Sequence, residues 1–283
     1  MFFDTDGNLA ICRRQIILRI EIVHVVGVVG AVVGRRFVCL CLLLCFAGCA
    51  GTGSSWSAHW PQQGGFGRAA SSAIKDPHTW APLVGAAVFA ATNLDEEVSR
   101  KAIENSGVFG DPQGSSNDLR DLAGAAYLLS LIVVPSDSIR DKASGLVLGL
   151  SATAATVGVA DGLKQLAGRQ RPVNDNDQSF PSGHASYTSV VTRLTQNNLS
   201  YIDMPAWQRT MLNAGLYGIA IGGAWARVEA GKHFPSDVLA GYALGSFFAA
   251  FFQEAFMSGH AGASVSFVPL DQGSAFTVVL PTR

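Results

Sequence analysis

The sequence contains few charged residues. Asp, Glu, Lys and Arg together make up 14% of the 283 residues, whereas hydrophobic residues make up 48%. The formal net charge is −1, so no excess of positive charge points to a nucleic-acid partner. This composition favours packed helices or proximity to a membrane, and the length suits one catalytic domain with appendages.

Cysteine is absent after Cys49, and all five cysteines lie between Cys12 and that position. The rest of the chain can therefore form neither a disulfide nor a thiolate metal site. Glycine is abundant, with 31 residues, but it follows no fixed period and we find no internal repeat. This argues against collagen-like and solenoid architectures, so the folded part must be stabilised by packing alone.

Residues 1–49 are typical of an N-terminal extension that ends in an export signal. Two arginines precede the apolar run 37–46, and small residues lead to Cys49. This end resembles a bacterial lipoprotein cleavage box, in which the cysteine is lipidated and becomes the first residue of the mature protein. Phe46 departs from that pattern, because it stands where lipoproteins usually have leucine. Cys49 is therefore a candidate lipidation site.

An alternative is that 22–34 and 37–50 form one interrupted membrane anchor. Each half is too short to cross a bilayer alone, which needs roughly 20 apolar residues. We expect an exported protein, anchored to the membrane of the cell envelope on the periplasmic side. An integral inner-membrane protein remains the alternative.

The composition divides the rest of the chain into three parts. Residues 50–72 are rich in Gly, Ser, Gln and Trp, which predicts a flexible tether. Residues 73–260 form the expected catalytic domain, and residues 261–283 form a C-terminal extension. Two β-type segments of the extension flank Asp271-Gln272-Gly273, a pattern that allows a small hairpin.

Apolar segments of helical length recur through the expected domain, and they predict an all-α fold, a bundle of about six core helices. Their length suits buried helices and falls at or slightly below a membrane span, so length does not choose between the two. A charged, amphipathic stretch over 94–105 predicts a surface helix capped by Asn93. The apolar segments are 82–91, 122–134, 146–166, 185–194, 211–226 and 238–257.

Lys164 and Arg171 form the first candidate motif. They are two helical turns apart, so both side chains would leave one face of a helix that Pro172 ends. Alone, two such cations more commonly mark a solvated helix face. Asp161 and Arg169 are interpreted as electrostatic partners on the helix, with the rim of a pocket as an alternative place for Arg169.

Ser182, Gly183 and His184 form the second motif. They follow Phe180-Pro181 in a turn that leads directly into the apolar run 185–194. The free backbone N–H groups of a helix start therefore lie beside this motif, and such groups bind phosphate readily.

Arg227, His233 and Asp237 form the third motif. Pro235 suits the first turn of the helix that follows, which places Asp237 within that turn and His233 just before it. The carboxylate can then reach back to one imidazole nitrogen, fix the tautomer and leave the other nitrogen free to attack. Taken alone, the histidines could be structural and Asp237 a helix-start carboxylate.

Together the three motifs resemble the tripartite signature of the type 2 phosphatidic acid phosphatase family, which vanadium haloperoxidases share. The resemblance covers about 75–256, and it implies an acid phosphatase/vanadium haloperoxidase-like helical fold. One departure is Ala226, because the family commonly has serine there. The missing hydroxyl would weaken phosphate binding by about 1 to 2 kcal/mol.

By this resemblance, His233 is the nucleophile that forms a phosphohistidine, Asp237 orients and stabilises it, and His184 protonates the leaving oxygen. The resemblance implies no metal and no cofactor, and the remaining histidines have no carboxylate or cysteine at ligand spacing. The implied phosphate-binding residues are Lys164, Arg171, Ser182, Gly183 and Arg227.

We therefore expect a metal-independent phosphatase that hydrolyses phosphomonoesters or pyrophosphates. A lipid phosphate is the favoured substrate because of the family and the membrane tether, with a soluble phosphomonoester as the alternative. Two other functions stay open: a haloperoxidase that binds vanadate in the same site, and a non-catalytic envelope lipoprotein that keeps the fold. The expected partners are the phosphorylated substrate and the membrane, without nucleic acid; the sequence does not indicate an oligomeric state.

Overall fold

The computed structural model describes residues 61, 64–105, 108–136, 139–173, 176–257, 264–270 and 273–279. All of them belong to the second of the two units into which the chain divides, Ala50–Arg283. The export signal and the lipidation site predicted at Cys49 lie outside the described residues.

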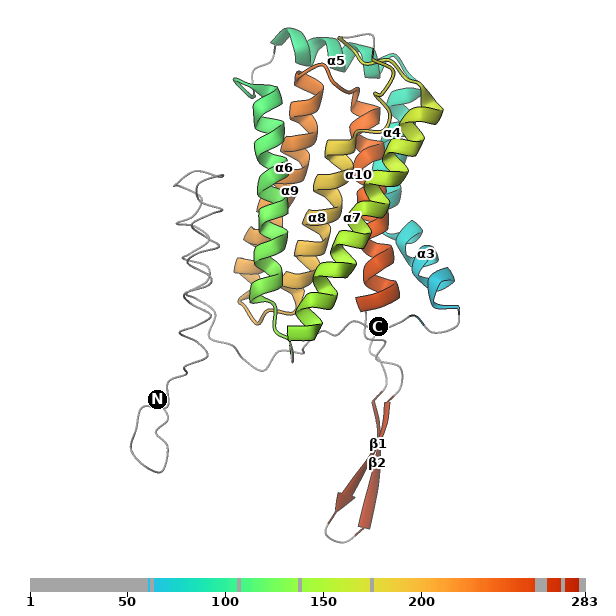
Figure 1. The fold of residues 1–283 in the computed structure, drawn as a ribbon, viewed down its shortest axis with the longest axis vertical. Helices are drawn as coiled ribbons and strands as arrows, with labels where there is room; N and C mark the ends of the chain where they lie inside the picture. Colours follow the sequence, from blue (N-terminus) through green and yellow to red (C-terminus); the bar gives the residue numbers. More distant parts are fainter. Residues whose placement is uncertain are drawn as a thin grey trace, which may run out of the picture. The chain divides into compact units, whose positions relative to one another are not determined.

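The described residues between Gly65 and Met257 are almost entirely helical, which confirms the predicted all-α fold (Figure 1). Each apolar segment of the sequence lies within or overlaps one helix. The helices are α3 (Gly65–Lys75), α4 (Pro77–Ala90), α5 (Leu94–Asn105), α6 (Pro112–Val133), α7 (Ile139–Ala167), α8 (Gly183–Ser200), α9 (Ala206–Glu229) and α10 (Pro235–Phe252), which continues into a π-helical turn, η1 (Gln253–Met257).

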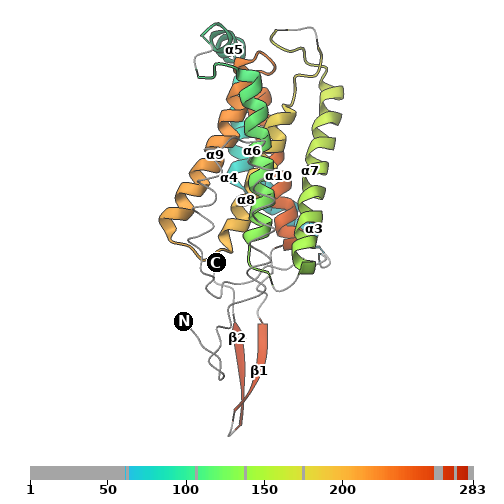
Figure 2. The same cartoon turned by 60° about the vertical axis from the view of Figure 1, so that its left-hand side comes forward.

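Helix α8 lies among α6, α7, α9 and α10 and contacts all four (Figures 1 and 2). Its approach to α10 is close because Gly241 and Gly245 face it. A Cβ atom on Gly241 would lie 2.5 Å from the backbone oxygen of Ser182, and one on Gly245 would lie 2.2 Å from that of Ser186. Since neither position has room for a side chain, these glycines allow α10 to press against the start of α8.

A buried apolar cluster joins α6, α7, α8 and α10. Tyr127 of α6 packs with Val190 and Leu194 of α8, and its hydroxyl donates to the carbonyl of Gly145 on α7 at 3.0 Å. This packing fixes the angle between the helices, and therefore the relative positions of their ends.

Helix α5 lies across one end of the bundle (Figure 1), where it contacts α4, α9 and α10. Its bounds confirm the surface helix predicted over 94–105. The carbonyl of Asn93 accepts the first helical hydrogen bond, from the N–H of Glu97 at 3.1 Å. The first turn is acidic, with Asp95, Glu96 and Glu97, which suits the positive end of a helix dipole.

Two predictions about helix ends are wrong. Helix α7 stops at Ala167, because Gly168 adopts a left-handed conformation with φ of 53°, so Arg171 lies beyond the helix and does not share a helical face with Lys164. Helix α3 occupies the last part of the predicted tether, 50–72, and packs against α10. Its buried face carries Ala69 and Ala73, which are four residues apart. The many Gly and Ser residues of this segment made that helical spacing hard to recognise in the sequence.

The C-terminal extension forms two strands. β1 (Ser264–Leu270) pairs with β2 (Gly273–Val279) in antiparallel register, from Ser264 opposite Val279 to Leu270 opposite Gly273. This is the small hairpin that the sequence allowed.

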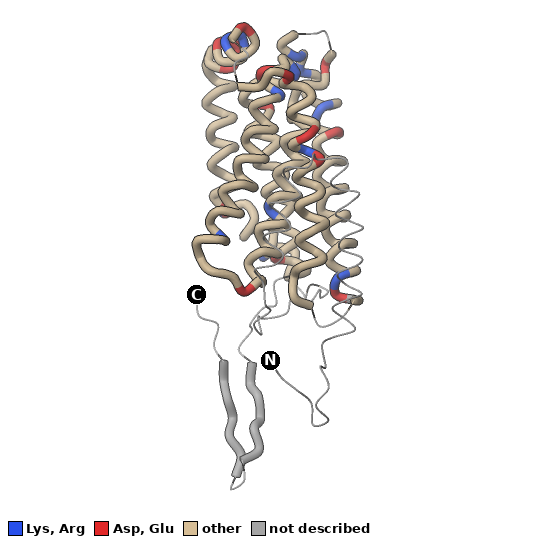
Figure 3. The backbone as a smooth tube through the Cα atoms, turned by 90° about the vertical axis from the view of Figure 1, so that its left-hand side faces the viewer, with Lys and Arg blue, Asp and Glu red and all other residues tan. Residues whose placement is uncertain are grey.

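Two described helices are long and apolar enough to cross a membrane, Asp141–Ala167 and Pro235–Met257. Length and composition alone support this, and buried core helices pass the same test. They differ in burial: 28% of the apolar window of the first segment is buried, against 44% of the second. Figure 3 shows many charged residues near the end of the bundle that carries α5, a smaller group near the opposite end, and few along the helices between them.

Candidate active site

The three sequence motifs meet at the end of the bundle that α5 crosses. The helices alternate in direction, so α7 and α9 end there and α8 and α10 begin there (Figure 1). The first motif spans the end of α7, the second spans the start of α8, and the third joins the end of α9 to the start of α10. Alternating helices thus bring together residues that are far apart in the sequence.

Direct contacts join the second motif to the other two. A Cβ atom on Gly183 would lie 3.0 Å from Nζ of Lys164, so the lysine ammonium reaches the start of α8. The backbone N–H of Ser182 donates to the carbonyl of Asp237 at 3.0 Å, and the Ser182 side chain caps α8 through the N–H of Ala185.

Two arginines of the site have no carboxylate partner among the described residues. Within the described part of the chain, Nε of Arg171 and Nε of Arg227 are buried and have no hydrogen-bond partner, and Nη1 of Arg227 donates a long hydrogen bond, 3.4 Å, to Oγ of Ser116. Burial, followed by the charge of Arg171, lowers the pKa of Arg227 to about 10. A charged guanidinium that is buried without a partner, as in Arg227, costs free energy, and an anion beside it would offset that cost.

Lys164 differs from the two arginines because it has a carboxylate partner. Its Nζ lies 2.7 Å from Oδ1 of Asp161, the pairing on α7 that the sequence indicated. Asp161 is more than half exposed, so this ion pair is screened by solvent and a phosphate can compete with it.

His184 is held by a residue that the sequence did not indicate. Its Nε2 lies 3.0 Å from Oδ1 of Asn117, in the first turns of α6. Because a carbonyl oxygen only accepts, Nε2 carries the hydrogen in the neutral ring. Burial, followed by the charges of Arg227 and Arg120, lowers the pKa of His184 to about 4. The imidazole is therefore neutral near pH 7 until a negative ligand arrives.

His233 is almost fully buried, and its Nδ1 lies 2.7 Å from the backbone oxygen of Ser179. The carbonyl accepts the Nδ1 hydrogen, which leaves Nε2 unprotonated in the neutral ring. Burial and then the charge of Arg227 hold the pKa of His233 well below its ordinary value, although the Ser179 carbonyl acts in the opposite direction. His233 is therefore neutral near pH 7, the state that a nucleophile needs.

Asp237 contacts His233 less directly than the sequence suggested. Its Oδ2 is 3.9 Å from Nδ1 of His233, whereas the same oxygen accepts from Oγ of Ser179 at 2.5 Å and from the N–H of Phe234 at 2.8 Å. The carboxylate is turned toward the start of its own helix and toward Ser179. Asp237 thus acts on His233 through Ser179, whose carbonyl is the direct partner.

The structure adds three residues, Ser179, Ser116 and Asn117, to those that the sequence indicated. Arg169, which the sequence suggested as a helix partner or at a pocket rim, lies beyond α7 and contacts Asp237 and Asp95. Ser179 precedes the second motif and so had a weak sequence signal. Ser116 and Asn117 lie on α6, far from the motifs in sequence, and only tertiary packing shows them. No group of three or more His, Cys, Asp or Glu residues that could hold a metal ion occurs within the described ranges.

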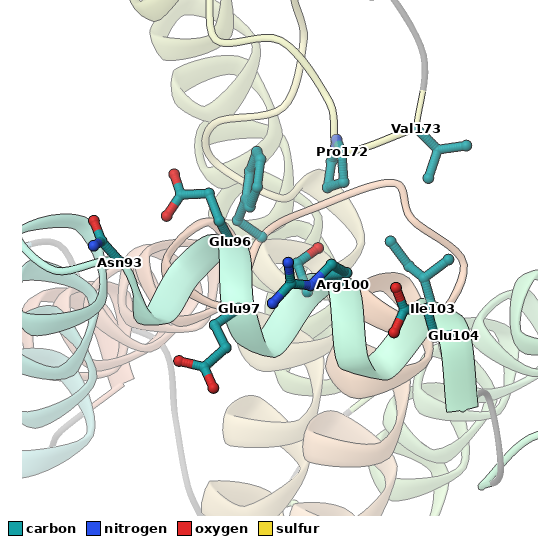
Figure 4. Close-up of a pocket in the computed structure, with 10 residues that line it drawn as sticks. Asn93, Glu96, Glu97, Arg100, Ile103, Glu104, Pro172 and Val173 are labelled. Atoms are coloured by element: carbon teal, nitrogen blue, oxygen red, sulfur yellow. The ribbon is translucent and has the colours of Figure 1, made fainter.

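A hollow of 670 Å³ lies beside the site, between α5 and the residues that follow the first motif (Figure 4). Phe234, next to His233, also lines it. Three glutamates, Glu96, Glu97 and Glu104, face one arginine, Arg100, in this lining. An acidic lining repels phosphate, so this hollow is a poorer place for an anion than the cationic cluster around His233.

Comparison with known proteins gives one family and one solved structure. Residues 145–256 match the PAP2 superfamily, and this segment contains all three motifs. No curated protein matches the chain. Among solved structures, the chain is similar to a transmembrane PAP2 type phosphatidylglycerolphosphate phosphatase from Bacillus subtilis, with 20% identity and a TM-score of 0.39 over 66% of this chain and 90% of that one. The match of residues 145–256 to the PAP2 superfamily agrees with the family that the three motifs indicated.

Proposed function

We propose that the chain is a phosphatase in which Nε2 of His233 attacks phosphorus. The observation that carries this proposal is the environment of His233. The imidazole is buried and neutral, and Ser179 accepts its Nδ1 hydrogen. Nearby are the buried Arg227 and the partly buried Arg171, neither with a carboxylate partner among the described residues. A tetrahedral phosphate supplies the missing negative charge and the electrophile together. The PAP2 match supports phosphatase activity.

The first chemical step transfers the phosphoryl group. The lone pair of Nε2 forms a bond to phosphorus while the bond to the leaving oxygen breaks, and that oxygen takes a proton from His184. Arg171, Arg227 and Lys164, with the N–H groups at the start of α8, stabilise the charge on the three equatorial oxygens. Gly183 contributes one of these N–H groups, whereas the N–H of Ser182 donates to the carbonyl of Asp237 and Ser182 acts as the cap of α8.

The second step hydrolyses the phosphohistidine. His184, now neutral, accepts a proton from water as the water oxygen attacks phosphorus, and the bond to Nε2 of His233 breaks. Inorganic phosphate leaves and both imidazoles return to their first states. None of these steps requires a metal ion, and a chelator tests that requirement directly.

His184 needs the substrate in order to act as an acid. Its pKa of about 4 in the free site leaves it neutral near pH 7. A phosphate dianion nearby favours the charged imidazolium and raises this pKa, and Asn117 accepts from Nε2 in both states. The substrate therefore supplies the charge that makes His184 a proton donor.

The substrate class that we propose is a lipid phosphate. Helices α4 and α7 expose large apolar side chains along their length, whereas many of the charged residues lie near the end that holds the site and few lie along the middle of the bundle (Figure 3). This arrangement suits a substrate whose phosphate is in water and whose hydrocarbon chains are in a bilayer. The exposed side chains include Trp80, Leu83, Val84 and Val88 of α4 and Leu146, Val147, Leu150 and Leu163 of α7.

The proposed location follows from the same features and from the N-terminal segment. We expect the exported protein to be attached to the membrane through lipidated Cys49, with the site on the periplasmic side. Replacement of Cys49 with Ser should then remove the lipid, as intact mass of the mature protein would report. An unprocessed chain that keeps residues 1–48 would favour the uncleaved anchor instead.

The test of the proposed function uses the full-length chain in detergent and its His233→Ala variant. Phosphate release is measured from phosphatidic acid in mixed micelles, from glycerol phosphate and from 4-nitrophenyl phosphate, with excess chelator in every reaction. We expect turnover of the lipid phosphate by the wild type alone. Equal turnover by His233→Ala would exclude the proposed nucleophile, and loss of activity with chelator would exclude metal independence.

Two further results of the same panel decide between alternatives. Faster turnover of glycerol phosphate than of the lipid would replace the lipid substrate with a soluble one. Peroxide-dependent bromide oxidation after addition of vanadate, without phosphate release, would identify a haloperoxidase.

A further inference from the structure

Arg169 connects two buried carboxylates next to the active site. Its Nη1 donates to Oδ1 of Asp237 at 2.8 Å and to Oγ of Ser236 at 2.7 Å, and its Nη2 donates to Oδ2 of Asp95 at 2.8 Å. The guanidinium carbon lies 4.1 Å from the centre of the Phe234 ring. Both terminal nitrogens are thus engaged by protein groups, so Arg169 is not available as a phosphate ligand in this state.

Asp95 links α5 to the start of α10 through hydrogen bonds. Its side chain is 1% exposed, and its Oδ1 accepts from the backbone N–H of Ser236 at 2.8 Å. The Ser236 hydroxyl donates to the other oxygen of the same carboxylate. A helix that crosses the end of the bundle is therefore hydrogen-bonded to the residue just before Asp237.

Ser179 completes a closed set of contacts between this cluster and the nucleophile. Its N–H donates to the backbone oxygen of Arg169 at 2.9 Å, and its hydroxyl donates to Asp237. Its carbonyl accepts from Nδ1 of His233. Arg169 therefore holds Ser179 twice, once through its own backbone and once through Asp237, and Ser179 holds the imidazole.

From these contacts we infer that Arg169 and Asp95 are positioning residues, which fix the ring of His233 for attack through Ser179 and Asp237. This inference rests on the proposed function and deepens it. Asp95 lies outside residues 145–256, the segment that matches the PAP2 superfamily, so α5 of this chain contributes to the same site.

The chemistry of the cluster requires an arginine. Asp95 and Asp237 are both fully buried, and one guanidinium neutralises both because its planar group offers two nitrogens in fixed directions. A lysine at position 169 keeps the charge but binds one carboxylate at a time. The Arg169→Lys variant therefore removes the bridge and keeps the net charge.

The test compares Arg169→Lys and Asp95→Asn with a matched control, Arg193→Lys. Arg193 forms a similar, largely buried ion pair with Asp76 at 2.7 Å, but none of its described contacts leads to His233. All variants are assayed as full-length chains for kcat, KM, thermal midpoint and inhibition by two oxyanions. Inorganic phosphate tests the cationic site, and vanadate tests the nucleophile too, because it bonds to the attacking nitrogen.

We expect kcat to fall about 10- to 100-fold in both variants, the usual effect of a misplaced reacting group. Vanadate should bind more weakly by a similar factor, while KM and the affinity for inorganic phosphate stay within about twofold. The double variant should be no slower than the slower single variant, because the two residues act as one unit. Arg193→Lys should keep the kcat of the wild type.

Other outcomes separate failure of this inference from failure of the proposed function. Loss of phosphate affinity with unchanged kcat would show that Arg169 is a phosphate ligand. Equal losses in Arg193→Lys, in step with its thermal midpoint, would show a structural role only. Unchanged kcat and vanadate inhibition in both variants would overturn the positioning role while leaving the phosphatase intact. A wild-type chain without turnover would overturn the function and this role together.

Discussion

Helices α7 and α10 are both apolar and long, yet the bundle uses them differently. Gly241 and Gly245 let α10 approach the start of α8 closely, whereas only 28% of the apolar window of α7 is buried. Each helix contributes to the phosphate site, α10 through Asp237 and α7 through Lys164. The comparison shows a site with a buried half, which sets the nucleophile, and a more exposed half, which supplies charge.

The difference extends to the polar contacts. In the buried half, Asp237 is surrounded by Ser179, Arg169 and the start of its own helix, and it is 0% exposed. In the exposed half, Lys164 is paired with a solvent-accessible aspartate, Asp161. Burial strengthens electrostatic interactions, so we expect substitutions in the two halves to differ in size even where the lost charge is the same.

The largest expected effect comes from removing one cation from each half: Arg227 at the end of α9, which is buried and so belongs to the buried half, and Lys164 of the exposed half. Arg227→Ala should lower kcat/KM about 100- to 1000-fold, because a buried charge that faces the transition state is lost. Lys164→Ala removes a charge already shared with Asp161, so its loss should be at least about tenfold smaller and should shrink further at high salt. Steady-state kinetics in low and high salt measure both. Equal losses of kcat/KM in the two variants, independent of salt concentration, would contradict the division of the site into a buried and an exposed half.

The next effect concerns His184 and the leaving group. His184→Ala should slow hydrolysis of an alkyl phosphate about 100-fold and that of 4-nitrophenyl phosphate much less, because nitrophenolate leaves without a proton. Comparison of kcat for the two esters measures this. A uniform loss for both esters would argue that His184 binds phosphate and donates no proton.

The pH dependence follows from the lowered pKa of His184. Protonation of the free enzyme at His184, with a pKa of about 4, should lower kcat/KM on the acid side. The reacting complex contains one proton, which the substrate monoanion brings and which His184 then donates. kcat/KM should therefore fall on the alkaline side as the substrate loses this proton, at its second pKa of about 6. A pH profile should therefore peak between these values. An alkaline optimum would contradict the requirement for one proton in the reacting complex.

A smaller effect tests the difference in packing between α10 and α7 and leaves the proposed catalytic residues unchanged. Gly245→Ala places a methyl group against the backbone of α8 and should cost about 1 to 3 kcal/mol of unfolding free energy. Gly158→Ala on α7 meets no atom of the described residues within 4 Å and should stabilise the chain by about 0.5 to 1 kcal/mol. Denaturant unfolding of the two variants measures both. The same sign for both changes would remove the contrast between the helices.

Much of the fold could be predicted from the sequence, because its signals are local. Apolar segments of helical length predicted the core helices, and Asn93 with the acidic turn after it predicted α5 at its observed bounds. Pro235 marked the start of α10 in the same way. These features depend on neighbours within one or two turns, which a sequence shows directly.

The errors lie where tertiary packing decides. Two helical turns separate Lys164 from Arg171 in sequence, but Gly168 ends α7 between them, and the loop that follows brings Arg171 to the cluster. The short sequence distance between His233 and Asp237 suggested a direct pair, whereas the carboxylate is satisfied by its own helix start and by Ser179.

The supporting residues of the site could not be predicted for a different reason. Asp95, Ser116 and Asn117 lie on α5 and α6, and their contacts with the motifs depend on how these helices cross the end of the bundle. No spacing rule relates them to residues more than 60 positions away. Arg169 had a sequence signal, but its buried partner, Asp95, did not.

The most direct test of the central claim is to trap the phosphoryl group on His233. The full-length chain is mixed with substrate, quenched in alkali within one turnover, digested and analysed by mass spectrometry for an alkali-stable, acid-labile phosphate. The account predicts this phosphate on the peptide that contains His233, and its absence from His233→Ala. A phosphate on another residue, or none at all during demonstrated turnover in single-turnover conditions, would contradict it.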